Sequence, residues 1–203
     1  MSDNSHLQQL AEIRSMMEKS SRFISLSGMS GVMAGIYAIG GAAYVHFNMD
    51  HRDRYSRVEL SNPELLHYIL VALAVVGLSL ITGFFLTQRR AKSQGQKLID
   101  RVAFRMLVNL SIPMMTGALF AIVLLVRGNY ELIAPVLLMF YGLGLINGSK
   151  YTLDDIRMLG ILEVMLGISC AILPEMGLIF WTLGFGFLHI LYGLRMWFKY
   201  ERS

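Results

Sequence analysis

The stretch from His67 to Thr87 reads HYILVALAVVGLSLITGFFLT and contains no Asp, Glu, Lys or Arg. A helix needs roughly 20 apolar residues to cross a bilayer core of about 30 Å. A strand of a membrane barrel would instead alternate apolar and polar side chains. The segment VALAVVGLSL (71–80) shows no such alternation. This stretch therefore predicts a transmembrane helix.

Similar apolar blocks recur along the whole chain. Of its 203 residues, 55% are hydrophobic and only 16% are charged, whereas soluble domains average about 45–50% and about 25%. The blocks predict six spans, over about residues 23–47, 67–87, 106–126, 132–146, 158–173 and 177–198. We therefore expect an all-α polytopic membrane protein, with a six-helix transmembrane bundle over residues 23–203.

Residues 1–22 precede the first span and are predicted to form a cytoplasmic amphipathic helix. Leu7, Leu10, Ile13 and Met17 recur at helical spacing, with charged residues between them. Such a helix can lie on membrane lipids, or it can dock a cytoplasmic protein partner. Both interpretations stay open.

The distribution of basic residues predicts the orientation. Cytoplasmic loops of membrane proteins collect Lys and Arg. With the N-terminus inside, 14 of the 18 Lys and Arg residues fall in inner segments. This favours cytoplasmic positions for both termini. It also explains the basic composition without a nucleic-acid partner.

Glu163 and His189 are ionisable residues near the middle of the fifth and sixth predicted spans. A charged group in hydrocarbon costs at least about 2.5–3.5 kcal/mol. One hypothesis is a proton- or ligand-binding pair with Tyr141 and Tyr192 as neighbours. The other is a buried polar clasp that only fixes helix packing. Nearer the cytoplasm, Thr152 and Asp155 have the spacing of a helix-capping box.

Small and amide residues indicate helix packing. Gly31 and Gly35 have the small-xxx-small spacing that lets two helices approach closely. Internal packing is the simpler interpretation, and a homo-oligomer seam is the alternative. Asn109 and Asn147 lie at similar depth on the third and fourth spans, where they can hydrogen-bond across the hairpin.

Repeated motifs suggest three helical hairpins. Met115-Thr-Gly117 resembles Met165-Leu-Gly167, and Tyr141-Gly-Leu143 resembles Tyr192-Gly-Leu194. Internal repeats are common in transporters. Short motifs also recur by chance in sequences built from a few apolar residue types.

No enzyme motif is present: the chain has no HExxH, no Walker A loop and no GxSxG. His46, His51 and His67 fall at one predicted level, but they are weak candidates for a metal or haem site, because histidines are common at membrane interfaces. We expect no enzymatic activity, no metal and no cofactor.

Three stretches resemble a known family: FISLSGMSGVMAGIYAIGGAAY (Phe23–Tyr44), GLGLINGSKYTLDDIRMLGILEVMLG (Gly142–Gly167) and GLIFWTLGFGFLHILYGLRMWFKYER (Gly177–Arg202). They are similar to an uncharacterised family of six-span bacterial inner-membrane proteins of the Bacteroidetes type, often encoded beside a winged-helix regulator. The resemblance implies a location, and it supplies no activity or site residues.

Two function classes follow. The favoured one is a non-enzymatic sensor, regulatory or partner-binding membrane protein. The alternative is a small transporter or channel that uses the Glu163–His189 pair. Polar residues in the spans are sparse, and a solute path normally needs more of them.

Overall fold

The computed structural model describes residues 26–48, 63–95 and 100–202, and every regular element in these ranges is helical. The predicted helix at residues 1–22 lies outside the described residues. The long helices are α2 (Gly28–Asn48), α3 (Pro63–Ser93), α4 (Arg101–Val126), α5 (Ile133–Gly148), α6 (Asp154–Ile172), and a continuous helix made of α7 (Gly177–Trp181), the π-helical segment η5 (Thr182–Leu188) and α8 (His189–Tyr200). Short 3-10 turns are η2 (Tyr130–Leu132), η3 (Ser149–Tyr151) and η4 (Pro174–Met176).

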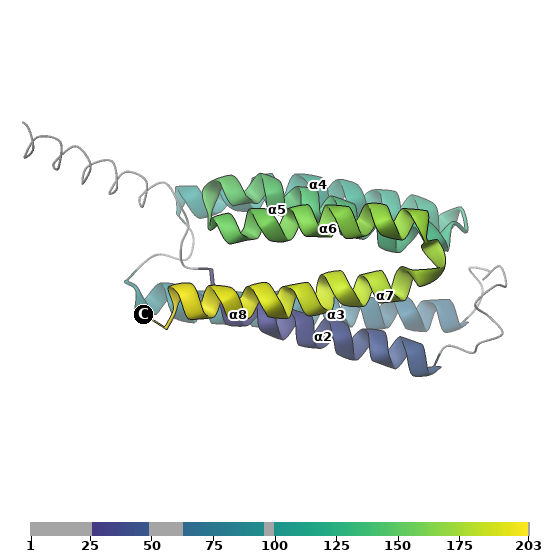
Figure 1. Cartoon of the computed structure of the whole chain (residues 1–203), viewed down its shortest axis with the longest axis horizontal. Helices are drawn as coiled ribbons and strands as arrows, with labels where there is room; N and C mark the ends of the chain where they lie inside the picture. The colour runs from purple at the N-terminus through teal and green to yellow at the C-terminus, as the bar shows by residue number, and fades with distance from the viewer. Residues whose placement is uncertain (1–25, 49–62, 96–99, 203) are drawn as a thin grey trace, which may run out of the picture.

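The helices form two layers (Figure 1). In one layer α5 packs against both α4 and α6, and in the other α2 packs against both α3 and α8. The helix that runs through α7, η5 and α8 also contacts α6 and α5, so it joins the layers. Of the predicted hairpins, α2–α3 and α4–α5 pack side by side, but α6 packs mainly along α5 rather than along the helix that follows it.

Five helical segments in the described part of the chain are long and apolar enough to cross a membrane: Gly28–Asn48, Leu66–Ser93, Arg101–Val126, Tyr130–Tyr151 and Pro174–Tyr200. The remaining predicted span is α6. It forms a helix of 19 residues, but Asp154, Asp155, Arg157 and Glu163 lower its apolar character. The described residues therefore contain a helix at each of the six predicted spans. Five of these six helices are long and apolar enough to cross a membrane.

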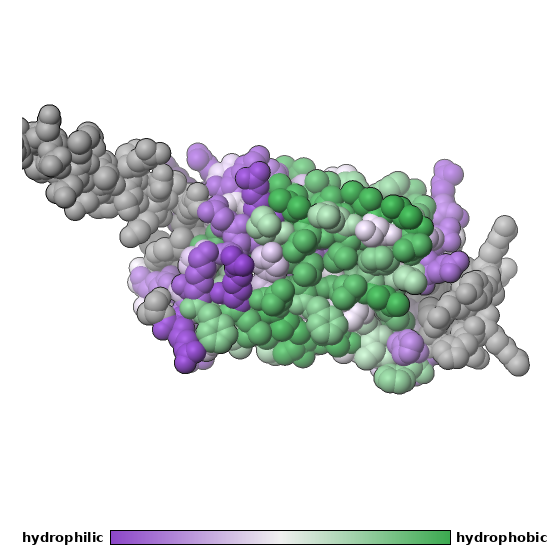
Figure 2. All heavy atoms as spheres, viewed as in Figure 1, coloured by the Kyte–Doolittle hydropathy of each residue, from purple (hydrophilic) through white to green (hydrophobic). Residues whose placement is uncertain are grey.

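The outer surface is apolar along the length of the bundle. Figure 2 shows a hydrophobic band across the middle of one face, with hydrophilic side chains toward the two ends. On α3, large side chains such as Leu73, Leu80 and Phe85 are exposed. A soluble protein rarely exposes such a continuous apolar surface, whereas contact with lipid requires one.

Glycines set the closest contacts inside the bundle. Gly35 of α2 lies against Gly186, such that an added methyl carbon would lie 2.5 Å from the Gly186 carbonyl oxygen. Gly31 packs one turn away against His189 and Gly193. The same close approach occurs between Gly142 of α5 and Gly160 of α6. Gly31 and Gly35 thus face the interior of this chain, where close backbone approach increases van der Waals contact.

Candidate functional site

A polar cluster lies in the middle of the bundle where α5, α6 and α8 meet. Glu163 comes from the middle of α6, His189 is the first residue of α8, and Tyr141 lies on α5. The His189 Nδ1 atom lies 3.5 Å from Glu163 Oε1. The Tyr141 hydroxyl lies 2.7 Å from His189 Nε2. The structure therefore brings together three of the four residues that the sequence singled out.

The cluster is closed to solvent. Glu163 has an exposed fraction of 0% and His189 one of 7%. Gly184 of η5 lies between the Glu163 carboxyl group and Leu138 of α5, close to both. A methyl carbon at Gly184 would lie 2.5 Å from Glu163 Oε2. A glycine at this position is what leaves room for the glutamate.

The hydrogen bonds define the tautomer of His189. Its Nδ1 atom lies 2.9 Å from the Gly184 carbonyl oxygen, which can only accept. Nδ1 therefore carries a hydrogen, and in the neutral ring Nε2 is an acceptor. The Tyr141 hydroxyl donates to that Nε2 atom. This assignment follows from the network of partners.

Glu163 is the least satisfied member of the cluster. Among the described residues, neither of its carboxylate oxygens has a hydrogen-bond partner. The 3.5 Å separation from Nδ1 is too long for a strong hydrogen bond. A buried ionised carboxylate without donors is costly, and such a group commonly takes up a proton instead. The chemistry that this arrangement supports is the binding of a proton, or of a small cation.

The π-helical segment η5 (Thr182–Leu188) was not predicted from the sequence. Such segments often occur at functional sites, and here η5 places the Gly184 carbonyl beside His189. Its Phe185 packs against the rings of Trp181 and Tyr141, with centroids 4.4 and 5.1 Å apart. Gly184 and Gly186 were the only local signal, and glycines in a membrane span more often indicate packing.

The fourth predicted member, Tyr192, packs against the apolar cluster that includes Leu159 and Met196, and Tyr141 packs against the same cluster. No hydrogen bond joins Tyr192 to the Glu163–His189 cluster in the described part of the chain. The two tyrosines therefore share an apolar contact and differ in the hydrogen bond that Tyr141 makes with His189.

The other predicted residues have separate positions. Asn147 donates to the Asn109 carbonyl oxygen at 2.9 Å, which links α5 to α4. His67 Nε2 lies 2.7 Å from the Tyr44 hydroxyl. His46 packs edge-on against its neighbour Phe47. Residues 26–48, 63–95 and 100–202 contain no group of three His, Cys, Asp or Glu residues suited to a metal, and His51 lies outside these ranges.

A second polar cluster ties α6 to the end of α8. Asp155 contacts Arg195 Nε at 2.8 Å and Lys199 Nζ at 3.0 Å, and it accepts a hydrogen bond from the Tyr200 hydroxyl at 2.8 Å. Burial favours the neutral carboxyl group, but the Tyr200 and Lys199 hydrogen bonds and the nearby positive charges outweigh it and lower the pKa of Asp155.

Asp155 lies in the first turn of α6, as the sequence predicted. The N-cap residue of α6 is Leu153, whose side chain makes no capping hydrogen bond. Asp155 also pairs with α8, because the end of that helix brings two basic side chains and a phenol to it.

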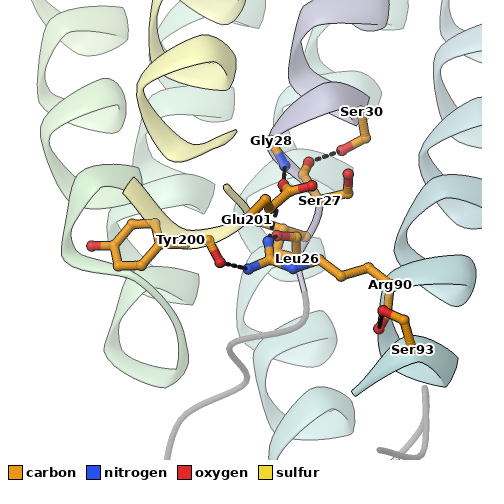
Figure 3. A network of polar contacts seen from close by, with 8 residues as sticks. All are labelled: Leu26, Ser27, Gly28, Ser30, Arg90, Ser93, Tyr200 and Glu201. Atoms are coloured by element: carbon orange, nitrogen blue, oxygen red, sulfur yellow. Dashed lines mark hydrogen bonds and ion pairs between the residues drawn. The ribbon is translucent and has the colours of Figure 1, made fainter. Parts of the chain in front are cut away.

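A third polar cluster lies at the same end of the bundle, around Arg90 near the end of α3. Figure 3 shows its guanidinium group between the start of α2 and the end of α8. It donates to the carbonyl oxygens of Leu26 and Tyr200 and to the Glu201 carboxylate. Nothing in the local sequence singles out Arg90, and the fold shows that it is buried.

Comparisons with protein-family models, with curated proteins and with solved structures each found no match for this chain. The functional argument therefore rests on the geometry described above.

Proposed function

We propose that this chain is a non-enzymatic integral membrane protein of the sensor or regulatory class, whose buried Glu163–His189 site binds a proton. We infer six transmembrane helices, with α6 as the sixth. Its charged first turn lies at the end of the bundle beside Lys199, and its one charged residue farther along, Glu163, is covered by other helices. The surface that α6 presents to lipid is therefore apolar, as a span requires.

The orientation and the partners are part of this proposal. Arg90, near the end of α3, and Arg195 and Lys199 of α8 lie at the same end of the bundle. The positive-inside tendency places that end in the cytoplasm. We infer a bacterial inner membrane, contact with membrane lipids, and an output to a cytoplasmic partner through residues 1–22.

The observation that carries the proposal is the buried, unpartnered carboxyl group of Glu163. With one proton shared between Glu163 and His189, the site has no net charge. Removal of that proton leaves a negative charge without donors between α6 and α8, which is strongly unfavourable. Proton loss and separation of the helices are therefore thermodynamically linked, as a sensor requires.

The closed geometry favours sensing over transport. On α6 the residues buried between Glu163 and Asp155 of the charged first turn are Ile156, Leu159 and Gly160, and those on the other side of Glu163 are Gly167 and Cys170. The residues between the two carboxyl groups are apolar, whereas transport needs a polar route to both faces. The site holds its ligand at one place between the two layers.

The test combines proton detection with a distance measurement. In lipid nanodiscs, infrared spectroscopy of the wild type should show a carboxylic acid band that Glu163→Gln removes and Glu175→Gln, at an exposed position, retains. Spin labels at Met165 and Ile36, in a Cys170→Ala background, report the spacing of the two layers. We expect this distance to change as the band is lost at high pH, and to stay constant in Glu163→Gln. A wild-type distance independent of pH would refute the sensor proposal.

A transporter remains the second candidate, because unpartnered carboxylate oxygens can exchange ions. Single cysteines at positions 163 and 189 should resist a membrane-impermeant thiol reagent if the site is sealed. Labelling at either position, together with proton flux into liposomes that is lost in Glu163→Gln, would replace the sensor function with transport.

A further inference from the structure

The Glu201 carboxylate, just after the end of α8, occupies an anion-binding geometry. Its Oε1 atom accepts a hydrogen bond from the backbone N–H of Gly28, the first residue of the 21-residue helix α2. The same oxygen lies 3.1 Å from Arg90 Nη1. A helix N-terminus and a guanidinium group are two features that proteins use to bind anions. Figure 3 shows the two converging on Glu201.

Arg90 has more hydrogen-bonding capacity than the chain uses. Its exposed fraction is 8%, and it donates to Leu26 O, to Tyr200 O at 3.0 Å and to Glu201. Its Nε atom is buried and has no acceptor among the described residues. A guanidinium group has five N–H donors in a planar fork. A buried donor without an acceptor is unusual, and a ligand with further oxygens would supply the missing acceptor.

We propose that Arg90 and the N-terminal end of α2 form a binding site for a phosphate group, and that Glu201 is its displaceable internal occupant. A phosphate group presents more acceptor oxygens than a carboxylate, and guanidinium groups commonly bind it in a bidentate manner. Glu201 can leave without unfolding α8, because it is the C-cap residue beyond the last helical turn. Its side chain is 15% exposed, so part of it reaches the surface.

Arg202, next to Glu201, adds a basic side chain at this end of the bundle, whereas Arg195 and Lys199 already pair with Asp155. The site is also at the hydrophilic end of the apolar band in Figure 2, the level at which lipid headgroups lie. Basic residues at that level attract anionic lipids. The phosphate can therefore belong to a lipid headgroup or be free in solution.

The consequence is a latch between the layers. While Glu201 is in place, it connects the end of α8 to α2 and α3. A phosphate group that replaces it satisfies Arg90 and Gly28 but frees residue 201. The site thus couples the presence of a phosphate group to the position of the chain after α8.

The test uses the whole chain in a maltoside detergent, which contains no phosphate. Glu201→Gln removes the competing charge and keeps the shape of the side chain. We expect inorganic phosphate to raise the unfolding temperature of Glu201→Gln at a concentration at least tenfold lower than in the wild type. Arg90→Lys in the Glu201→Gln background keeps the charge but loses the fork, and it should lose this response. Glu175→Gln is the matched control and should behave like the wild type.

A second arm separates the sources. Phosphatidylglycerol is added to the micelles and compared with a phosphate-free diglucosyl lipid. Stabilisation of Glu201→Gln by inorganic phosphate and by phosphatidylglycerol would identify a general phosphate site, and stabilisation by phosphatidylglycerol alone would identify a lipid headgroup site. No stabilisation by either, or an equal response in Arg90→Lys, would overturn the proposal. These readouts do not involve Glu163, so they are independent of the proposed proton site.

Discussion

The hydroxyl of Tyr200 donates to Oδ2 of Asp155 at 2.8 Å, and this bond fixes the C-terminal end of α8 to the first turn of α6. The backbone carbonyl of the same tyrosine accepts from Arg90 Nη2 at 3.0 Å. One residue therefore connects α6 of one layer with α3 of the other. At the middle of the bundle, the Glu163–His189 pair joins α6 and α8 a second time.

The stability that Asp155 contributes should depend on pH. Despite its burial, its hydrogen bonds to Tyr200 and Lys199 and the charges of Lys199 and Arg195 lower the pKa of Asp155 below the usual 3.8. A carboxyl group whose pKa is lower in the folded protein stabilises the fold above its unfolded pKa, and that stabilisation is lost as the pH falls through the folded value. Asp155→Asn should thus cost about 1.5–3 kcal/mol at neutral pH, and less below about pH 4.

Unfolding of the wild type and Asp155→Asn in mixed micelles between neutral pH and pH 3 measures this difference. Glu175→Gln, at an exposed position in the loop between α6 and α7, should show almost none. A cost for Asp155→Asn that stays constant over the whole range would show that the charge of Asp155 plays no part.

The contact between α2 and α8 predicts opposite results for two glycines of one helix. A methyl group at Gly35 would lie 2.5 Å from the Gly186 carbonyl oxygen, and a backbone atom cannot move aside without shifting the helix. Gly35→Ala should cost about 1–3 kcal/mol, as overpacking usually does. At Gly40 no described atom lies within 4 Å of the added carbon. Gly40→Ala should be neutral, or stabilising by up to about 1 kcal/mol. Thermal unfolding of both variants, in one detergent, tests this prediction.

The sequence was most informative where lipid imposes the pattern. The apolar stretch from His67 to Thr87 lies wholly inside α3, because every residue in it can face hydrocarbon or another helix. The pairing of Glu163 with His189 was also predictable, since two ionisable residues at similar depth in neighbouring helices have few alternatives. The charged residues of α6 keep it from meeting the apolar requirement that the other five helices meet.

The rest depended on contacts that no local pattern encodes. Arg90 lies among several basic residues in the sequence. It is buried and hydrogen-bonded only because Leu26 and Glu201, which are distant in the chain, approach it in the fold. The π-helical segment contains Gly184, which packs against Glu163 of α6, and its own residues gave no sign of a π-helix. Tyr141 and Tyr192 have a similar sequence context and pack against the same apolar cluster, and only the positions of their helices decide that Tyr141 is the one bonded to His189.

These two tyrosines form a matched pair for the next prediction. Tyr141→Phe removes the hydroxyl that donates to His189 Nε2 and leaves a buried acceptor unpaired, which should cost about 1–3 kcal/mol. Tyr192→Phe removes a hydroxyl that has no hydrogen bond to the site and should cost much less. Nitrogen NMR of labelled histidine should show a changed His189 signal in Tyr141→Phe only. If both variants altered the signal equally, the Tyr141–His189 bond would not be the one that defines the tautomer.

A double-mutant cycle on Gly184 and Glu163 measures how closely the two residues pack, as the coupling energy between them. A methyl carbon at Gly184 would meet Glu163 Oε2 at 2.5 Å and Leu138 Cδ2 at 2.6 Å. Gly184→Ala alone should therefore cost about 1–3 kcal/mol. Glu163→Ala alone leaves a cavity where the carboxyl group was, and it should also destabilise the protein. In the double variant the new methyl group enters that cavity, so the combined cost should be smaller than the sum, by about 0.5–3 kcal/mol for residues in contact.

Gly177→Ala, whose added carbon would lie 3.8 Å from Ala134 Cβ, should be additive with Glu163→Ala. Additivity at Gly184 as well would mean that the glycine and the carboxyl group are not packed together, and the closed proton site would lose its structural basis.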